Sequence, residues 1–133
     1  MSSGSVVPAN AVPQIRIVML PKDTNALGSI FGGVILSHID LAAGEHARGI
    51  APHLYVTKVV REVEFIAPVK VGDMVSYYTE TKAIGKTSVT VRVLVCAERG
   101  VGKREAIKVT EAEVVMVAID DQGKPIPIMP VSS

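Results

Sequence analysis

The chain has 133 residues, of which 48% are hydrophobic, and its 14 basic and 13 acidic side chains give a formal net charge of +1. This length supports one hydrophobic core and excludes two independent domains of ordinary size. The balanced charge and the absence of Trp argue against nucleic acid and anionic membrane surfaces as partners. Cys96 is the only cysteine, which excludes an intramolecular disulfide, predicts a buried small side chain and favours a cytoplasmic location.

The first segment, residues 1–13, is predicted to be a flexible tail without a signal peptide, because it has no basic stretch and contains two prolines. Residues 14–21, "QIRIVMLP", are rich in β-branched side chains and predict a short strand. Residues 22–29, "KDTNALGS", have the composition of a loop.

One helix is predicted over residues 30–48, because apolar side chains recur there at spacings of three and four residues. Ser29 is expected to cap its start, and Gly49 is expected to end it shortly before a proline. The apolar run near residues 30–43 is interrupted by His38 and Asp40 and is too short to cross a bilayer. No membrane partner is therefore expected.

Four strands separated by turns are predicted after the helix, over residues 55–68, 74–84, 87–98 and 106–120. In the third, valines at every second position, 89 to 95, predict one fully buried face. A helix that is apolar nearly all round can be satisfied only if the sheet curls around it. The predicted class is α+β: a hotdog fold over residues 14–128, with a five-stranded antiparallel sheet around one long central helix and a C-terminal tail at 129–133. A second copy is expected to cover the sheet edge, giving a homodimer or a larger assembly.

Standard catalytic motifs are missing from the sequence. The three histidines lack the spacing of a zinc site, and neither a GxSxG elbow nor a GxxxxGK[ST] loop occurs. The residues that remain are Asn25, the pair Gly32 and Gly33, and Asp40.

Asp40 interrupts the apolar helix, so it must reach solvent, find hydrogen-bond donors or lie in a cleft with a raised pKa. An exposed position is the ordinary expectation for a helical aspartate, but this helix has almost no polar stripe. Glu45 and His46 come later and are expected at the solvent-exposed end of the helix, where they cap it or face solvent.

Gly32 and Gly33 open the helix although each glycine costs about 1 kcal/mol relative to alanine. Either they allow close packing against the sheet, or they let a ligand carbonyl reach the free N–H groups at the positive end of the helix. Asn25 either stabilises a turn or orients a water molecule. Amides that polarise a carbonyl, an amide that orients water and a general base together suffice to hydrolyse an activated acyl group.

The segment "DTNALGSIFGGVILSHID" resembles the signature of the hotdog acyl-CoA thioesterases, specifically the bacterial YciA-like acyl-CoA hydrolases. The likeness continues in "VEFIAPVKVGD", "IGKTSVTV" and "TEAEVVMVAIDDQGKP", so that it covers about residues 14–128. It implies hydrolysis of an acyl-coenzyme A to a free acid and coenzyme A, with no metal or organic cofactor. It also implies a homodimer that assembles into a hexamer, a trimer of dimers.

The resemblance also implies roles for single residues. Asp40 matches the catalytic acidic residue, acting as a general base or as a nucleophile that forms an anhydride. Asn25 would serve the site that holds Asp40 of the partner subunit, and the amides of Gly32 and Gly33 would face the thioester carbonyl. Phe31 departs from the animal enzymes, which have His before the glycine pair, and this favours the bacterial branch.

Coenzyme A would lie along the "GKTS" stretch, namely Gly85, Lys86, Thr87 and Ser88. The charge and donors of this stretch suit a diphosphate, although an ordinary polar hairpin turn has the same composition. Lys103 and Arg104, in a basic loop, are further candidates for contact with the nucleotide phosphates, and such a run is also typical of a solvated turn.

Two other classes remain open. A hotdog hydratase or dehydratase would need a histidine paired with an acidic residue on the helix, but His38 and Asp40 are two positions apart and should face different ways. A non-catalytic acyl-CoA-binding sensor would not need both Asn25 and Asp40.

Overall fold

The computed structural model describes residues 7, 11–102 and 104–129. Most of both predicted tails and Lys103 lie outside these residues, so the division into tails and one domain at 14–128 stays a prediction. The elements, in chain order, are β1 (Ile15–Val18), a 3-10 turn η2 (Pro21–Asp23), α1 (Gly32–Ile50), β2 (Leu54–Phe65), β3 (Met74–Ile84), β4 (Ser88–Glu98) and β5 (Ala106–Ile119).

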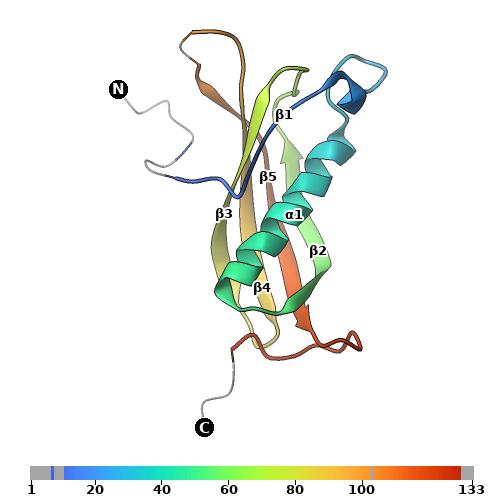
Figure 1. The fold of residues 1–133 in the computed structure, drawn as a ribbon, viewed down its shortest axis with the longest axis vertical. Helices are drawn as coiled ribbons and strands as arrows, with labels where there is room; N and C mark the ends of the chain where they lie inside the picture. The colour runs from blue at the N-terminus through green and yellow to red at the C-terminus, as the bar shows by residue number, and fades with distance from the viewer. Residues whose placement is uncertain (1–6, 8–10, 103, 130–133) are drawn as a thin grey trace.

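The five strands form one sheet in the order β1-β3-β4-β5-β2, and all neighbours are antiparallel. The helix α1 lies along one face of this sheet and is tilted across its strands (Figure 1). The predicted arrangement of one helix and a five-stranded antiparallel sheet is therefore confirmed. No helix within the described ranges is both long and apolar enough to cross a bilayer.

The core lies between α1 and the middle strands of the sheet. On β4 the four alternating valines are all 0% exposed, which confirms the predicted buried face. Small side chains on the helix let it approach the sheet closely, and its buried residues are Ile35, Ile39, Ala42, Ala43 and Ala47. Cys96 is 1% exposed, and burial raises the pKa of its thiol to about 11, as expected for a small packed side chain.

The helix begins and ends two residues later than predicted. The backbone of Ile30 is extended, because it pairs with Thr24 and its N–H donates to Val69 O at 2.8 Å. The N-cap is Phe31, with no side-chain cap, so the expectation that Ser29 caps the helix was wrong. Gly49 stays helical, and the C-cap is Ala51, whose extended backbone is the one that a following proline favours.

The strand β2 ends at Phe65, three residues before the predicted end. Ile66 leaves the sheet while its N–H still donates to Val109 O at 2.7 Å. As an edge strand, β2 has one unpaired side. Several large apolar side chains beside this edge are exposed, namely Leu36, Leu41, Leu54, Val56, Val60 and Phe65. Within residues 7, 11–102 and 104–129, nothing covers this side of the core.

Candidate active site

Asp40 projects from the third turn of α1 toward the edge strand β2. The residue is half-buried, and its Oδ1 accepts a hydrogen bond from the Oγ1 of Thr57 on β2. The same hydroxyl lies 3.6 Å from the Sδ of Met116. The carboxylate therefore has a fixed orientation at the boundary between the helix and the open edge of the sheet.

Thr57 is a candidate site residue that the sequence alone did not reveal. It stands in a run of β-branched residues, "YVTKVV", where threonine is an ordinary strand former. The order of elements offered a signal, because a strand that runs back along the preceding helix brings its first residues beside that helix. The pairing with Asp40, seventeen positions earlier, required that spatial argument.

Asn25 organises the loop that precedes the helix. Its side-chain Oδ1 accepts hydrogen bonds from the N–H groups of Leu27, at 2.9 Å, and Ser29, at 3.2 Å. Its own N–H donates to Ser29 O at 2.8 Å. The turn-stabilising role is thus present in the structure. Because both contacts come from donors, the oxygen must face the loop, and the amide nitrogen has no acceptor among the described residues.

The start of α1 has free N–H groups. Neither Gly32 nor Gly33 has a hydrogen-bond acceptor for its amide within the described part of the chain, and the N-cap Phe31 supplies none. A Cβ on Gly32 would lie 3.6 Å from the Phe65 ring, which is ordinary contact, and one on Gly33 would meet only the exposed Phe31 ring at 2.8 Å. Packing against the sheet therefore does not require either glycine.

These candidate groups fall into two clusters within one copy of the chain. Asn25 and the glycine pair lie at the start of the helix. Asp40 follows Gly32 by eight residues, which is about 12 Å along a helix axis. Gly33 and Asp40 share one helix face, because seven residues complete about two turns. The two clusters are therefore separate in one copy, although Gly33 and Asp40 lie on the same face of α1.

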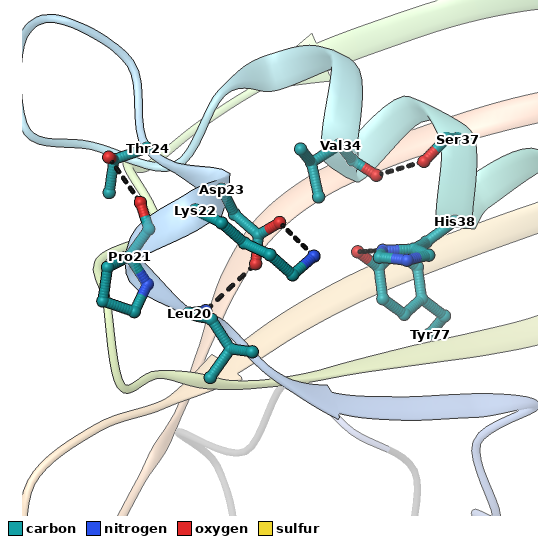
Figure 2. Close-up of polar contacts among 9 residues, drawn as sticks. All are labelled: Leu20, Pro21, Lys22, Asp23, Thr24, Val34, Ser37, His38 and Tyr77. Carbon is teal, nitrogen blue, oxygen red and sulfur yellow. Dashed lines mark hydrogen bonds and ion pairs between the residues drawn. The ribbon is translucent and has the colours of Figure 1, made fainter.

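His38 faces the opposite side of the helix from Asp40. Its Nδ1 lies 3.3 Å from the hydroxyl of Tyr77 on β3, and the two rings meet edge to face with centroids 5.5 Å apart. Figure 2 shows this pair beside Lys22 and Asp23, which form an ion pair at 3.3 Å. Burial lowers the pKa of His38, although the nearby Asp23 carboxylate opposes this shift. The histidine and acid pair of a hydratase is not formed here.

His46 is not at the solvent-facing position that was expected for it. Its two ring nitrogens lie 2.9 Å and 2.7 Å from the hydroxyls of Thr79 and Thr81 on β3. Burial lowers the pKa of this imidazole. Glu45, in contrast, is exposed as expected and pairs with Arg48 at 2.7 Å.

The residues expected to hold coenzyme A lie at two ends of the sheet. The "GKTS" stretch forms the β3–β4 turn, closed by the N–H of Gly85 donating to Ser88 O at 2.8 Å. The side chain of Lys86 is exposed, and Thr87 is half-buried. Arg104 lies in the β4–β5 loop, where its Nη2 donates to Glu98 O at 2.7 Å. The eleven residues of β4 separate the two groups by about 33 Å, so one copy does not bring them to the same phosphate.

Among the described residues, no group of three or more His, Cys, Asp or Glu side chains is arranged to hold a metal ion.

Comparisons of the sequence with known proteins find a matching family and similar proteins. Residues 27–103, more than half of the chain, match the family model described as the thioesterase superfamily. The chain is 39% identical over 122 residues to the acyl-CoA thioester hydrolase YciA of Escherichia coli K12, covering 86% of this chain and 91% of that protein.

Solved structures give the same result. A hexameric hotdog fold thioesterase of Campylobacter jejuni is 43% identical, with a TM-score of 0.84 over 88% of this chain and 90% of that one. An aspartate-to-alanine mutant of a hexameric broad specificity acyl-coenzyme A thioesterase is 34% identical, with a TM-score of 0.85 over 90% and 87% of the two chains. The hotdog fold predicted from the sequence is thereby confirmed.

Proposed function

The chain belongs to the thioesterase superfamily, and from this we propose that it is an acyl-CoA thioesterase, which hydrolyses an acyl-coenzyme A to a free carboxylic acid and coenzyme A. The observation that carries the proposal is the contact between Asp40 and Thr57 on the open side of α1. When one oxygen of a carboxylate accepts a hydrogen bond from a hydroxyl, the other oxygen stays free to bind a water molecule.

In the proposed reaction Asp40 acts as general base and takes a proton from water while the water oxygen attacks the thioester carbonyl carbon. The N–H groups of Gly32 and Gly33 stabilise the oxyanion that forms. The carbon–sulfur bond then breaks, and the proton passes to the departing thiolate of coenzyme A. In the alternative course, Asp40 attacks directly, and water hydrolyses the resulting anhydride. Both courses use only protein groups and water, and coenzyme A is part of the substrate and product.

Asn25 acts as a hydrogen-bond donor in this proposal. Two backbone N–H groups occupy its oxygen, so the amide nitrogen is the end that remains for a ligand. It would donate to the oxygen of the attacking water or of the thioester carbonyl. The isosteric change Asn25→Asp retains an oxygen for the loop and removes the donor, so kcat should fall about 100-fold while the loop stays intact.

A complete site requires two copies of the chain in this proposal. If β2 pairs antiparallel with β2 of a second copy, the start of one helix approaches the middle of the other. Asn25 and the glycine pair of one protomer would then face Asp40 of the partner subunit. The two solved relatives described above are hexameric, and we propose a homodimer that assembles into a hexamer here.

Mixing two inactive variants tests this arrangement. In dimers formed from Asp40→Asn and Asn25→Asp protomers, one site carries both changes and the other carries neither. Random reassembly should therefore restore about one quarter of native activity, since half of random dimers are mixed and half of their sites are intact. No recovery, with mixed dimers demonstrated by mass spectrometry, would place both residues in the same protomer's site.

Coenzyme A contacts would also come from different copies. Lys86, Thr87 and Ser88 on the β3–β4 turn supply donors for phosphate, and Arg104 and Lys103 would approach from another protomer.

A cytoplasmic location remains a prediction from the single cysteine.

Thiol release from acyl-CoAs between acetyl and palmitoyl is the direct test of the function. We expect thiol release with several members of this panel, whereas a matched set of oxygen esters that lack coenzyme A should yield no free acid. Binding of acyl-CoA without any thiol release would instead support a non-catalytic sensor.

A further inference from the structure

After β5 the chain turns back and crosses the end of the sheet at which β3 joins β4 (Figure 1). We call residues 124–128, "KPIPI", the C-terminal strap. Its two prolines have a fixed backbone angle and no N–H, so Ile126 and Ile128 are the donors in its last four positions. The N–H of Ile126 donates to Ala118 O at 2.9 Å. The N–H of Ile128 donates to Lys86 O at 2.8 Å. The strap therefore ties the end of β5 to the β3–β4 turn.

Ile128 is the point at which the strap is fixed. It is 0% exposed, and its carbonyl oxygen accepts a hydrogen bond from the Nε2 of His53 at 2.8 Å. His53 is in turn held at the end of α1, because its N–H donates to Ala51 O at 2.9 Å and its ring meets the Tyr55 ring edge to face. A series of hydrogen bonds thus runs from the end of α1 through His53 and Ile128 to Lys86.

This series fixes the peptide unit between Lys86 and Thr87. In a planar trans peptide the carbonyl and the N–H point in opposite directions, so the N–H of Thr87 points away from the strap. It has no acceptor among the residues that the structure describes. The carbonyl of Thr87 is also occupied, by the N–H of Ala118 at 2.9 Å. The turn is therefore held by β5 and by the strap, and it keeps one free N–H next in sequence to a lysine.

We propose that the C-terminal strap and His53 position this turn for the phosphates of coenzyme A. The proposal rests on the function above, which assigns those phosphates to residues 85–88. His53 is then a positioning residue, which acts through Ile128 and touches no substrate. A turn that had to be ordered on binding would lose affinity to that ordering, and the strap orders it beforehand. Loss of the strap contact should therefore weaken ligands that carry phosphate and spare ligands that lack it.

Two non-hydrolysable ligands test the proposal by calorimetry, namely the S-hexyl thioethers of coenzyme A and of pantetheine, of which only the first carries phosphate. His53→Leu removes the donor to Ile128 O. The Kd of the coenzyme A thioether should rise about fivefold, the size of one hydrogen bond, while the Kd of the pantetheine thioether stays unchanged. His53→Gln can still donate through its side-chain amide and should keep most of the native affinity.

A second pair of variants breaks the same series at its other hydrogen bond. Ile128→Pro removes the N–H that donates to Lys86 O. Ile128→Val is its matched control, because it keeps that N–H and most of the buried volume. The selective loss of affinity is expected in Ile128→Pro alone, and thermal unfolding of each variant shows that it is folded.

The two ligands separate failure of this inference from failure of the proposed function. Equal weakening of both thioethers would show that the strap only supports the fold, and unchanged affinity for both would show that the turn does not depend on it. Either result overturns the inference and leaves the thioesterase function standing. Native protein that binds both thioethers equally well would instead remove the phosphates from this turn, and the inference with them. A selective loss supports the inference whether or not thiol is released from acyl-CoAs.

Discussion

The two sides of α1 differ in how fully the chain satisfies their polar residues. On the side toward β3, His38 and His46 are half-buried and meet the hydroxyls of Tyr77, Thr79 and Thr81. On the side toward β2, Asp40 receives a hydrogen bond from Thr57. The apolar neighbours on that side are exposed along a strand that has one unpaired edge.

We expect this difference to separate structural from functional polar groups on a single helix. A half-buried imidazole with a hydroxyl at one or both nitrogens has little capacity left, so its contacts serve to hold the helix on the sheet. A carboxylate can accept about four hydrogen bonds, and Asp40 uses few of them. The carboxylate of Asp40 faces the uncovered edge of β2, so its remaining acceptor positions are available to a substrate or to a second copy of the chain.

The largest effect should come from Asp40→Asn. Removing a general base typically lowers kcat by about 100-fold to 10,000-fold, while the neutral amide can still accept the Thr57 hydrogen bond and preserve the fold. Thiol release and thermal unfolding measured together check this. His38→Gln is the matched change on the other side, and it should leave kcat within a few-fold. Equal losses in the two variants would contradict the separation of the sides.

Thr57→Val should have the next largest effect. It removes the hydroxyl that orients the Asp40 carboxylate and keeps the β-branched shape, so kcat should fall about tenfold, the size of one hydrogen bond to a charged group. Thr57→Ser retains the hydroxyl and should recover most of the rate. A kcat for Thr57→Val equal to that of the native protein would show that the contact does not matter to the reaction.

Tyr77→Phe should show the converse pattern. The change removes a buried hydroxyl that contacts His38 and should lower the free energy of unfolding by about 1 kcal/mol. Since the ring stays in place on the side of the helix away from Asp40, kcat should not change. Urea unfolding and thiol release check the two parts, and a reduced kcat with unchanged stability would oppose this assignment.

Local sequence patterns predicted the elements and the buried face of β4 because strand alternation and helix periodicity are set by neighbouring residues. They misplaced the helix start because Ile30 is fixed by Val69, almost forty residues away. The same limit applies to the site. Asp40 stood out as a carboxylate in an apolar run, but Thr57 did not, since its role depends on how β2 folds back along α1.

The position of His46, on the β3 side of α1, is a second case that local sequence patterns could not predict. Next to Glu45 and near the end of the helix it is predicted to face solvent, yet two threonines of β3 lie opposite its two ring nitrogens. Those threonines are ordinary strand residues in the sequence. Side chains whose partners come from another element, or from another copy of the chain, cannot be assigned by periodicity.

The smallest effect is a pH dependence of stability that comes from the two histidines on the β3 side of α1. Burial lowers the pKa of His38 and His46 below the ordinary value of 6.5. Below pH 6.5 the unfolded chain therefore binds more protons at these residues than the folded chain, and stability must fall as the pH decreases through the folded-state pKa values. Above pH 6.5 both states are neutral there, and the full contribution is present.

His46→Gln tests this effect, because glutamine can still hydrogen-bond to threonine hydroxyls but does not titrate. The decrease in the free energy of unfolding between pH 7 and pH 5 should be shallower in this variant, whereas kcat should keep its native pH profile because His46 faces away from Asp40. Carboxylates do not confuse the comparison, because the native protein and the variant carry the same Asp and Glu residues. An unchanged slope would mean that His46 is as easily protonated in the folded protein as in the unfolded chain, and that the β3 side of the helix is less closed than its contacts indicate.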